Sequence, residues 1–353
     1  MVALIDTTGV LNLAQTAAMQ KDMLQRGIQD LFAGDVQLKD LLKFVDTAGA
    51  MNYKFYRADP DNQAVAGYGN INEEFNVVSS ELEQVEETIK LMGNYIRIDK
   101  RISGDSSLAE KPGPVQMRSL LGQMAREFND AVVNGDAQVK FGTSGSGGAV
   151  FRPDGIRQRL LRASKYKSDT SFILDAGGID LTVQNINTPN VRTLARYLDE
   201  LIYELKPDAM FVNRYLKAIL AAVWREGGML DTTQDSMGRT FLKYGNVNII
   251  DTGLKTATRT AHNLADTTNW VNAWETAAGV LNPTAAAGAR FTSIMMARLG
   301  TNDFHAIQPY AMRTDGPTLL PNRIHEQWMV DWGYGFVNKS TNCLGWVKNI
   351  LVG

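Results

Sequence analysis

The sequence has little of what catalytic and metal-binding sites are usually built from. It contains a single cysteine, Cys343, so no disulfide can form within the chain, and scarce cysteine is typical of proteins of a reducing compartment. The three histidines, His262, His305 and His325, lack the close spacing of metal ligands. We therefore expect no metal and no other cofactor, and we predict that the chain is not an enzyme.

A strong net charge is absent too. The formal net charge is -2 and the pI is near 6.0, so the chain has no overall basic field for nucleic acid, which still leaves room for a local basic face. No apolar run approaches the roughly 18 residues that a membrane span requires. The first residues also lack the basic and apolar regions of a secretory signal. We expect a soluble protein with no membrane partner, made and used in a cytoplasm.

Hydrophobic periodicity predicts a mixture of helices and strands. Apolar residues at three- and four-residue spacings predict helices over 11–33, 112–134, 189–205 and 216–224. Alternating or continuous apolar residues predict strands over 53–57, 85–98, 209–212, 328–337 and 344–352. Because helices and strands do not alternate regularly along the chain, we predict the α+β class and not a parallel-sheet enzyme fold.

Two of these extended segments flank a polar, glycine-rich stretch and predict a long two-stranded hairpin. Apolar residues as far as Tyr95 share one face of the second strand, whereas Ile96 and Ile98 have the opposite phase. We therefore expect a β-bulge at Gly93 that reverses the two faces. A hairpin with little hydrophobic mass is marginal in water on its own, so we expect it to lie against other chains.

A second stretch rich in glycine and serine covers residues 142–148. It lacks the Gly-Lys-Ser/Thr ending of a phosphate-binding P-loop, and it does not have the glycine spacing of a dinucleotide-binding turn. We predict a flexible surface loop.

Two segments of opposite charge are the candidate functional residues. The acidic segment, residues 73–87, contains only glutamates among its charged residues: Glu73, Glu74, Glu81, Glu83, Glu86 and Glu87. The basic segment, residues 152–167, has Asp154 as its one acid beside Arg152, Arg157, Arg159, Arg162, Lys165 and Lys167. The simplest interpretation is two solvated faces. Alternatively, the acidic segment of one subunit docks on the basic segment of its neighbour, or the basic segment contacts the phosphates of packaged DNA.

Three local sequences follow one another along the chain. They are Glu127–Asp136 with the later Pro153-Asp154-Gly155-Ile156, then Ala209–Arg214, and last Gln327–Phe336. In this order they resemble the helix-ending motif, the strand-to-helix step of the axial domain and the closing peripheral strand of tailed-bacteriophage major capsid proteins. These proteins have the Hong Kong ninety-seven type of capsid fold. The order of the elements carries the resemblance more than any single motif does.

The resemblance implies a domain organisation. It assigns residues 1–45 to an N-terminal arm, 46–84 to an extended hairpin called the E-loop, and 85–184 to a peripheral domain. That domain contains the long spine helix 112–134 and the glycine-rich loop 142–148. Residues 185–320 form the axial domain, and 321–353 return to the peripheral domain. Since only about 45 residues precede the hairpin, we expect no large built-in scaffolding segment, and either a separate scaffolding protein or none.

The resemblance also implies a function. Chains self-assemble through pentamers and hexamers into an icosahedral shell around double-stranded DNA, in the virion and, during assembly, in the host cytoplasm. Portal, scaffolding and decoration proteins are further expected partners. Two alternatives stay open: the shell protein of an encapsulin nanocompartment, which uses the same fold to hold a cargo enzyme, and a metal-free enzyme. The polar stretch 229–290 and the basic segment favour the virus.

Overall fold

The structure is a computed structural model. It describes residues 38, 41–58, 82–100, 112–143, 149–182, 188–226, 230–234, 240–255, 268–319, 321 and 324–353. The predicted helix over 11–33 lies outside the described residues. Residues 59–81 of the expected hairpin and 144–148 of the glycine-rich stretch also lie outside them.

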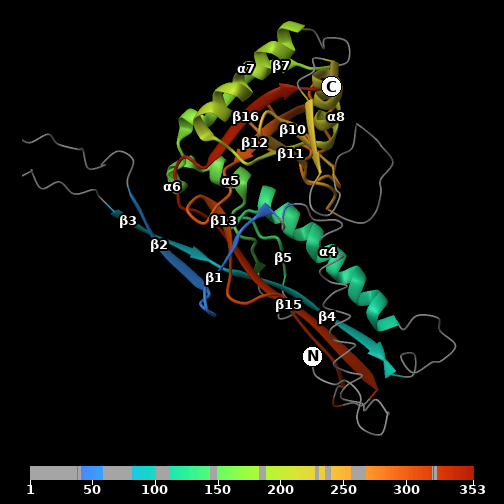
Figure 1. The fold of residues 1–353 in the computed structure, drawn as a ribbon. Coiled ribbons are helices and arrows are strands. Elements are labelled where there is room, and N and C mark those ends of the chain that lie inside the picture. Colours follow the sequence, from blue (N-terminus) through green and yellow to red (C-terminus); the bar gives the residue numbers. More distant parts are fainter. Residues whose placement is uncertain are drawn as a thin grey trace, which may run out of the picture.

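The described chain forms two parts, each built around its own sheet (Figure 1). The elongated part has a five-stranded sheet lined by one long helix, and the compact part has a seven-stranded sheet with two further helices. The C-terminus lies in the compact part. This arrangement confirms the predicted α+β class.

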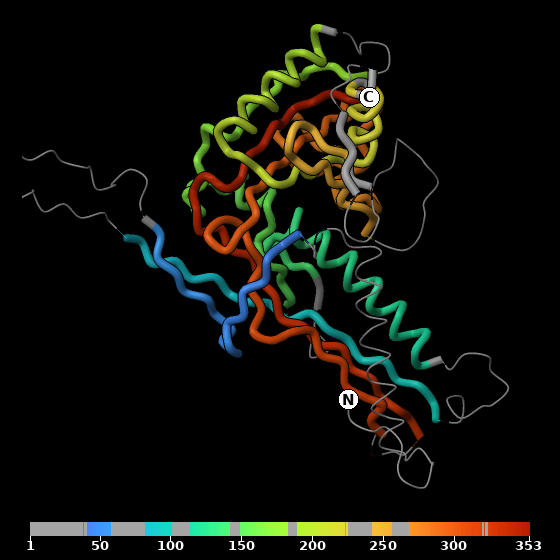
Figure 2. Tube along the Cα trace, viewed as in Figure 1, coloured from blue at the N-terminus to red at the C-terminus, as the bar shows by residue number. Residues whose placement is uncertain are grey.

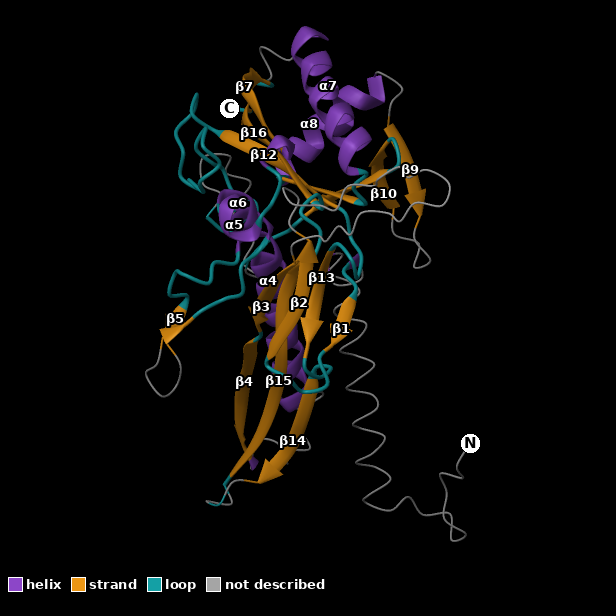
Figure 3. Cartoon of the chain, turned by 90° about the vertical axis from the view of Figure 1, so that its left-hand side faces the viewer, coloured by secondary structure: helices purple, strands orange, loops and turns teal. Residues whose placement is uncertain are grey.

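The long helix α4 (Pro112–Asn134) has the bounds that the periodicity predicts. Proline suits the first turn of a helix because its missing N–H needs no partner there. Buried Met117, Leu121, Met124 and Phe128 recur at spacings of three and four and form the apolar stripe of the helix. Figure 3 shows the helix lying along one face of the elongated sheet.

The end of α4 is a close crossing of two backbone segments. The N–H of Gly135 donates to the carbonyl of Ala131 (N···O 3.0 Å), and the N–H of Gly155 donates to the carbonyl of Gly135 (2.9 Å). A Cβ on Gly135 would stand 2.2 Å from the carbonyl oxygen of Pro153, and one on Gly155 would stand 2.5 Å from that of Ala131. Only glycine fits at both positions, which explains the two glycine-containing motifs around residues 135 and 155.

Strand β15 is the centre of the elongated sheet, and β4 pairs with it antiparallel from Asp99 opposite His325 to Lys90 opposite Tyr334. These two strands, far apart in sequence, run side by side in Figure 2. Strands β14 and β13 pair with successive halves of β15, and β1 adds to β13 in parallel. The bounds are β1 (Phe44–Asp46), β4 (Lys90–Asp99), β13 (Phe304–Gln308), β14 (Arg313–Leu319) and β15 (His325–Asn338).

A two-stranded hairpin projects from the elongated part (Figure 1). Strand β2 (Asn52–Ala58) pairs antiparallel with β3 (Leu82–Thr88), with Asn52 opposite Thr88 and Ala58 opposite Leu82. The described residues thus include the base of the predicted hairpin. Its tip lies among the residues that are not described.

The predicted β-bulge at Gly93 is wrong. Strand β4 pairs with β15 through Gly93 without a shift of register. The phase of the apolar residues changes at Ile89 instead, because the chain there leaves its hairpin partner β2 and joins β15. Gly93 has a different role: a Cβ at this position would stand 2.4 Å from the carbonyl oxygen of Val330.

The compact sheet has the strand order β7-β16-β12-β8-β11-β10-β9. Helix α7 (Thr188–Leu205) buries Leu194, Leu198 and Leu201 and leaves Tyr203 exposed, and helix α8 (Arg214–Glu226) follows β8. Both helices match the predicted ones closely. The strands are β7 (Ile173–Asp180), β8 (Ala209–Val212), β9 (Leu230–Gln234), β10 (Thr240–Tyr244), β11 (Val247–Asp251), β12 (Phe291–Ala297) and β16 (Leu344–Leu351).

The two sheets divide the chain differently from the expected domain boundaries. Strand β7 falls in the expected peripheral segment 85–184 but joins the compact sheet, and β13 and β14 fall in the expected axial segment 185–320 but join the elongated sheet. Strand β16 belongs to the expected return 321–353, yet it pairs with β7 and β12 of the compact sheet. Long-range pairing decides the sheet of a strand, and local periodicity does not report it.

Five short elements connect α4 to β7. They are β5 (Gly142–Thr143), β6 (Ala149–Val150), α5 (Ile156–Leu161), α6 (Ala163–Tyr166) and the 3-10 turn η2 (Thr170–Phe172). Helices α5 and α6 lie where the two parts of the molecule meet (Figure 1). This position matters for the candidate site, because the basic segment includes both helices.

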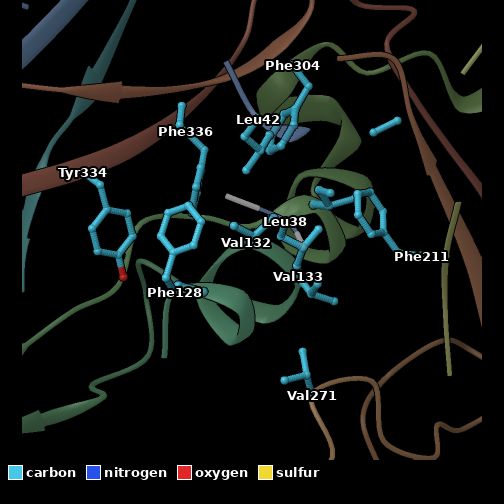
Figure 4. Close-up of a cluster of buried hydrophobic side chains, with 14 of the residues drawn as sticks. Leu38, Leu42, Phe128, Val132, Val133, Phe211, Val271, Phe304, Tyr334 and Phe336 are labelled. Atoms are coloured by element: carbon cyan, nitrogen blue, oxygen red, sulfur yellow. The ribbon is translucent and has the colours of Figure 1, made fainter. Parts of the chain in front are cut away.

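Phe128 of α4 lies at the centre of an aromatic cluster. Its ring centroid stands 5.0–6.0 Å from those of Phe44, Trp332, Tyr334 and Phe336. Figure 4 shows Phe128 beside Tyr334 and Phe336 in the larger of the core clusters. Phe128 therefore contacts both β1 and β15 from the buried face of the helix.

Replacing this side chain tests the attachment. We expect Phe128→Ala to lower the free energy of unfolding by about 3–5 kcal/mol, since it removes a large buried ring and leaves a cavity. Tyr203→Ala is the control, because the Tyr203 side chain is 83% exposed, and its effect should stay within about 0.5 kcal/mol. Urea unfolding followed by tryptophan fluorescence measures both. Equal effects of the two variants would contradict this description of the core.

Candidate functional site

The acidic segment forms strand β3 where the structure describes it. Glu83, Glu86 and Glu87 lie on this strand. Because side chains alternate between the two faces of a strand, Glu83 and Glu87 share the face of buried Phe55, and Glu86 faces the other way. The remaining predicted residues, Glu73, Glu74 and Glu81, lie outside the described residues.

All three described glutamates form ion pairs within the chain. Glu86 pairs with Lys54 across the exposed face of the hairpin (3.5 Å), and such exposed pairs contribute little to stability. Glu83 pairs with Arg57 (3.1 Å), whose guanidinium is buried. Glu87 pairs with Arg159 of the basic segment (2.7 Å).

The basic segment forms the short helices α5 and α6. Residues two apart on a helix are separated by about 200° around its axis, so Arg157 and Arg159 of α5 point in opposite directions. Their side chains are only 1% and 0% exposed. Two fully buried guanidinium groups need partners within the protein, because an unpaired buried charge is costly.

Arg157 reaches toward the compact part of the molecule. Its Nη1 lies 2.6 Å from Oε1 of Glu275 and donates to the carbonyl of Gly279 (3.0 Å). Its Nη2 donates to Oδ1 of Asn272 (2.8 Å), and its Nε donates to Oδ1 of Asn134 at the end of α4 (2.9 Å). This one side chain therefore joins α4, α5 and the loop that precedes β12.

Glu275 is as deeply buried as its partner. Its Oε1 also accepts a hydrogen bond from the hydroxyl of Ser293 on β12 (2.9 Å). Burial raises the pKa of the Glu275 carboxyl, whereas the Arg157 guanidinium and the Ser293 hydroxyl oppose that rise. The Arg157 side chain makes four hydrogen bonds in this interior, whereas Glu275 accepts two, both at Oε1, and its Oε2 has no partner among the described residues.

Arg159 reaches toward the hairpin and the elongated sheet. Its Nη1 lies 2.7 Å from Oε1 of Glu87 and donates to Oδ1 of Asn338 (2.6 Å). Its Nη2 donates to the carbonyl of Phe336 (2.8 Å), and its Nε donates to that of Asp154 (3.0 Å). The structure therefore brings together one residue of the acidic segment and one of the basic segment, within the same chain.

Asp154 pairs with two of the other basic residues, Arg162 and Lys165. Its carboxylate lies 3.1 Å from Arg162 and 3.2 Å from Lys165, and it accepts hydrogen bonds from the Tyr166 hydroxyl and the Ala137 N–H. Burial opposes its ionisation, but these hydrogen bonds together hold the pKa of Asp154 below its ordinary value. Arg162 also binds both carboxylate oxygens of Asp136, at 2.8 Å each.

The two ends of the basic segment are also accounted for. Arg152 pairs with Glu127 and Asp130 of α4, and its guanidinium stacks on the ring of Phe141. Burial raises the pKa of Glu127 in spite of the attraction of Arg152. Lys167 ends α6 in the left-handed conformation, with a φ of 50°.

These contacts correct the sequence-based hypotheses for Arg157 and Arg159. For the other basic residues, contacts with a neighbouring subunit or with DNA stay a prediction, and the Lys165 side chain is 52% exposed. Arg157 and Arg159 form no solvated face, and they are not available to a neighbouring subunit or to DNA, because both are sealed inside their own chain. The predicted pairing of acidic and basic segments does occur at Glu87, but inside one chain. The basic segment is an internal junction between the two parts of the molecule and the hairpin.

Several residues of this junction were not predicted from the sequence. Glu275 and Asn272 lie in the polar stretch 229–290, where no charge run marks them, and Asn338 lies at the end of β15. Their common signal is only that a polar side chain stands next to apolar neighbours, such as Trp274 beside Glu275. Such a pattern is too frequent to identify a partner for a particular arginine.

Three further features of the described residues concern metal ligands, the single thiol and membrane-spanning helices. It has no group of three or more histidine, cysteine, aspartate or glutamate side chains that could hold a metal ion. Burial raises the pKa of the Cys343 thiol to about 12, so it is not a thiolate near neutral pH. None of the described helices is both long enough and apolar enough to span a membrane.

Comparison with known proteins gives a result for structures only. No family model and no curated protein matches the sequence. The chain is similar to that of the holo-SrpI encapsulin complex from Synechococcus elongatus, with 12% identity, a TM-score of 0.55, and 89% of this chain and 86% of that chain covered. It is also similar to the capsid of a native GTA particle, with 12% identity, 90% of both chains covered and a TM-score of 0.51.

The capsid of the Myoviridae phage XM1 gives a similar match, with 8% identity, 90% of this chain and 92% of that chain covered, and a TM-score of 0.50. Such coverage means that the likeness extends over the architecture and is not limited to one motif. The chain has the Hong Kong ninety-seven type capsid fold. From the expected domain organisation we take the names spine helix for α4, peripheral for the elongated part and axial for the compact part.

His305 is a buried histidine of β13 that lies against Tyr53 at the base of the hairpin. His305 of β13 donates from Nδ1 to the carbonyl of Asp303 (3.3 Å), its Nε2 has no partner among the described residues, and its ring meets that of Tyr53 edge-on at 6.2 Å. Burial lowers the pKa of His305; Lys339 and Arg159 lower it further, and the Asp303 carbonyl acts in the opposite direction. Charging this ring is therefore unfavourable in the folded chain.

A pH dependence of stability follows from His305. Because its pKa is lowered on folding, the unfolded chain binds the proton more readily, and stability falls as the pH drops below the ordinary value of about 6.5, by at most about 1.4 kcal/mol per pH unit. Between pH 7.5 and 5.5, urea unfolding should show a smaller decrease in the free energy of unfolding for His305→Gln than for the wild type. The control His325→Gln should show the same His305-dependent decrease as the wild type. The same pH dependence in both variants would refute the assignment to His305.

The buried pair of Arg157 and Glu275 has a measurable effect on stability. We expect Arg157→Ala to lower the free energy of unfolding by about 3–5 kcal/mol, because it leaves the Glu275 carboxylate buried without its partner. The control is Arg97→Ala, since Arg97 is exposed and contacts Gln327, and its effect should stay below about 1 kcal/mol. Unchanged stability of Arg157→Ala together with a defect in assembly would instead favour a contact between subunits.

Proposed function

We propose that this chain is a major capsid protein, which self-assembles through pentamers and hexamers into an icosahedral shell. The observation that carries the proposal is the capsid fold, matched over about nine tenths of the chain to chains of an encapsulin complex and of particle capsids. A ring of identical subunits needs two different surfaces that fit each other. An elongated subunit with a projecting hairpin is suited to such contacts.

Exposed apolar side chains support contacts with other copies. On the outward face of the hairpin, Tyr56 is 69% and Leu82 is 62% exposed. On the peripheral sheet, Leu91 and Tyr95 of β4 are also exposed. Apolar side chains gathered on extended elements of a chain are typical of surfaces that contact other proteins.

The role that we propose is structural and not catalytic. The chain would act in the virion, and in the host cytoplasm during assembly. Its main partner would be itself, and portal, scaffolding and decoration proteins would be the further partners of such a shell. Since many subunits act together, modest contacts at each interface suffice for a stable particle.

For the contents of the shell we propose double-stranded DNA. The long polar stretch 229–290 supports this choice, but the basic segment does not, because its arginines are paired inside the chain. The alternative is an encapsulin-like shell around a protein cargo. The match to the encapsulin complex, with a TM-score of 0.55, favours keeping that alternative.

Negative-stain electron microscopy of the purified full-length chain tests the assembly. We expect closed shells, or rings of five and six subunits. A uniform population of monomers at all protein concentrations and salt conditions would overturn the proposal.

The contents are tested on particles isolated from the producing cells. We expect nuclease-protected double-stranded DNA inside them. Particles that instead contain a protein cargo and no protected nucleic acid would favour the encapsulin alternative and contradict the DNA proposal.

A further inference from the structure

The base of the hairpin packs on the peripheral domain through a small hydrophobic cluster of its own. Phe55 and Ile89 lie against Ile307 and Val337, with partly buried Val85 beside them. This cluster has four buried members and is separate from the two large core clusters. Since hydrophobic stabilisation grows with the buried apolar area, apolar packing alone holds the hairpin weakly.

Two arginines add polar contacts between the hairpin and the junction helices. Arg159 of α5 binds Glu87 of β3, and Arg57 of β2 donates to the carbonyl of Tyr166 at the end of α6 (2.6 Å). An arginine of the junction thus binds a hairpin carboxylate, and an arginine of the hairpin binds a junction carbonyl. The position of β2 and β3 is therefore defined relative to α5 and α6.

When Glu87 leaves Arg159, one N–H of Nη1 loses its acceptor, but Nε, Nη1 and Nη2 each keep one. Arg159 retains three other acceptors: the carbonyls of Asp154 and Phe336 and Oδ1 of Asn338. The side chain of Glu87 keeps 15% of its surface exposed, so water can solvate its carboxylate when it moves away. Glu275 in the neighbouring pair is 0% exposed and has no such route to water.

The roots of the hairpin are anchored independently of this pair. The N–H of Ile89 donates to the carbonyl of Met51 (2.8 Å), which ties the two strands together at the body. The turn before β2 is held by Thr47, whose N–H donates to the carbonyl of Gln308, and by Gly49, whose N–H donates to that of Pro309. If the hairpin changes its direction relative to the body, it would therefore pivot at Met51 and Ile89.

We propose that the ion pair between Glu87 and Arg159 is a releasable latch for the hairpin. When it is closed, it fixes the direction in which β2 and β3 leave the body. When it opens, the hairpin pivots about Met51 and Ile89, and its strand pairing loses the support of the body because an isolated hairpin is marginal in water. The five-stranded and seven-stranded sheets stay folded. The purpose of such a latch rests on the proposed function. A subunit that enters rings of five and of six must meet its neighbours at two angles, and a releasable hairpin can adopt both.

Hydrogen–deuterium exchange on the full-length chain tests the latch. The variant is Glu87→Ala, and the matched control is Glu86→Ala, which removes the adjacent glutamate from the opposite, exposed face of the same strand. All proteins are compared in the same assembly state. We expect exchange in peptides covering 52–58 and 82–88 to be on the order of tenfold faster in Glu87→Ala, as for loss of a hydrogen bond to a charged group.

Exchange in 112–134 and 344–351 should remain unchanged in both variants, and the control should match the wild type throughout. Equal exchange of the hairpin peptides in the two variants overturns the latch. If Glu87→Ala also speeds exchange in 112–134 and 344–351, the isosteric Glu87→Gln decides. Faster exchange confined to the hairpin supports the latch, and any other pattern in Glu87→Gln overturns it.

This readout separates the latch from the proposed function. Failure to form shells would contradict the proposed function and leave the exchange of the hairpin peptides interpretable. Normal shells without a difference in exchange between Glu87→Ala and Glu86→Ala would overturn the latch alone.

Discussion

Arg157 and Glu275 meet at the place where the spine helix ends and the peripheral and axial parts of the chain come together. Both charges are shielded from water, so each depends on the other and on the surrounding amide, hydroxyl and carbonyl groups. The pair thereby fixes α5 against the end of α4 and against the loop that precedes β12, which we call the axial loop. The close backbone crossing at Gly135 and Gly155 serves the same junction, because it brings α5 directly below the end of the helix.

From this junction the arrangement extends to the hairpin. Arg159 leaves α5 on the side opposite to Arg157 and binds the carbonyl of Phe336 in β15 as well as Glu87 in β3. One short helix therefore contacts the axial loop, the central strand of the peripheral sheet and the hairpin base. The two ion pairs differ in their access to water, because Glu275 is 0% exposed and Glu87 is 15% exposed.

The sequence predicts the elements well and their partners poorly. The spine helix and the axial helices were predicted because their apolar residues repeat with a local period. The bulge at Gly93 was wrong because the same change of phase arises when a strand exchanges one partner for another at Ile89. The basic segment looked like a surface because a run of charges does not report burial, and because Glu275 lies more than a hundred residues from Arg157. The glycines at 135 and 155 lie in the motifs that carry the resemblance, but those motifs predicted neither the crossing nor the burial of the arginines beside it.

Electron cryomicroscopy of the particle that we propose, at a resolution that shows side chains, tests most directly whether these arginines hold each subunit together or link one subunit to the next. The structure predicts that in every subunit Arg157 contacts Glu275 of its own chain and that Arg159 stays in its own-chain site below the hairpin. Density that joins either arginine to a glutamate of a neighbouring chain, or to nucleic acid, would contradict the assignment of the basic segment as an internal junction.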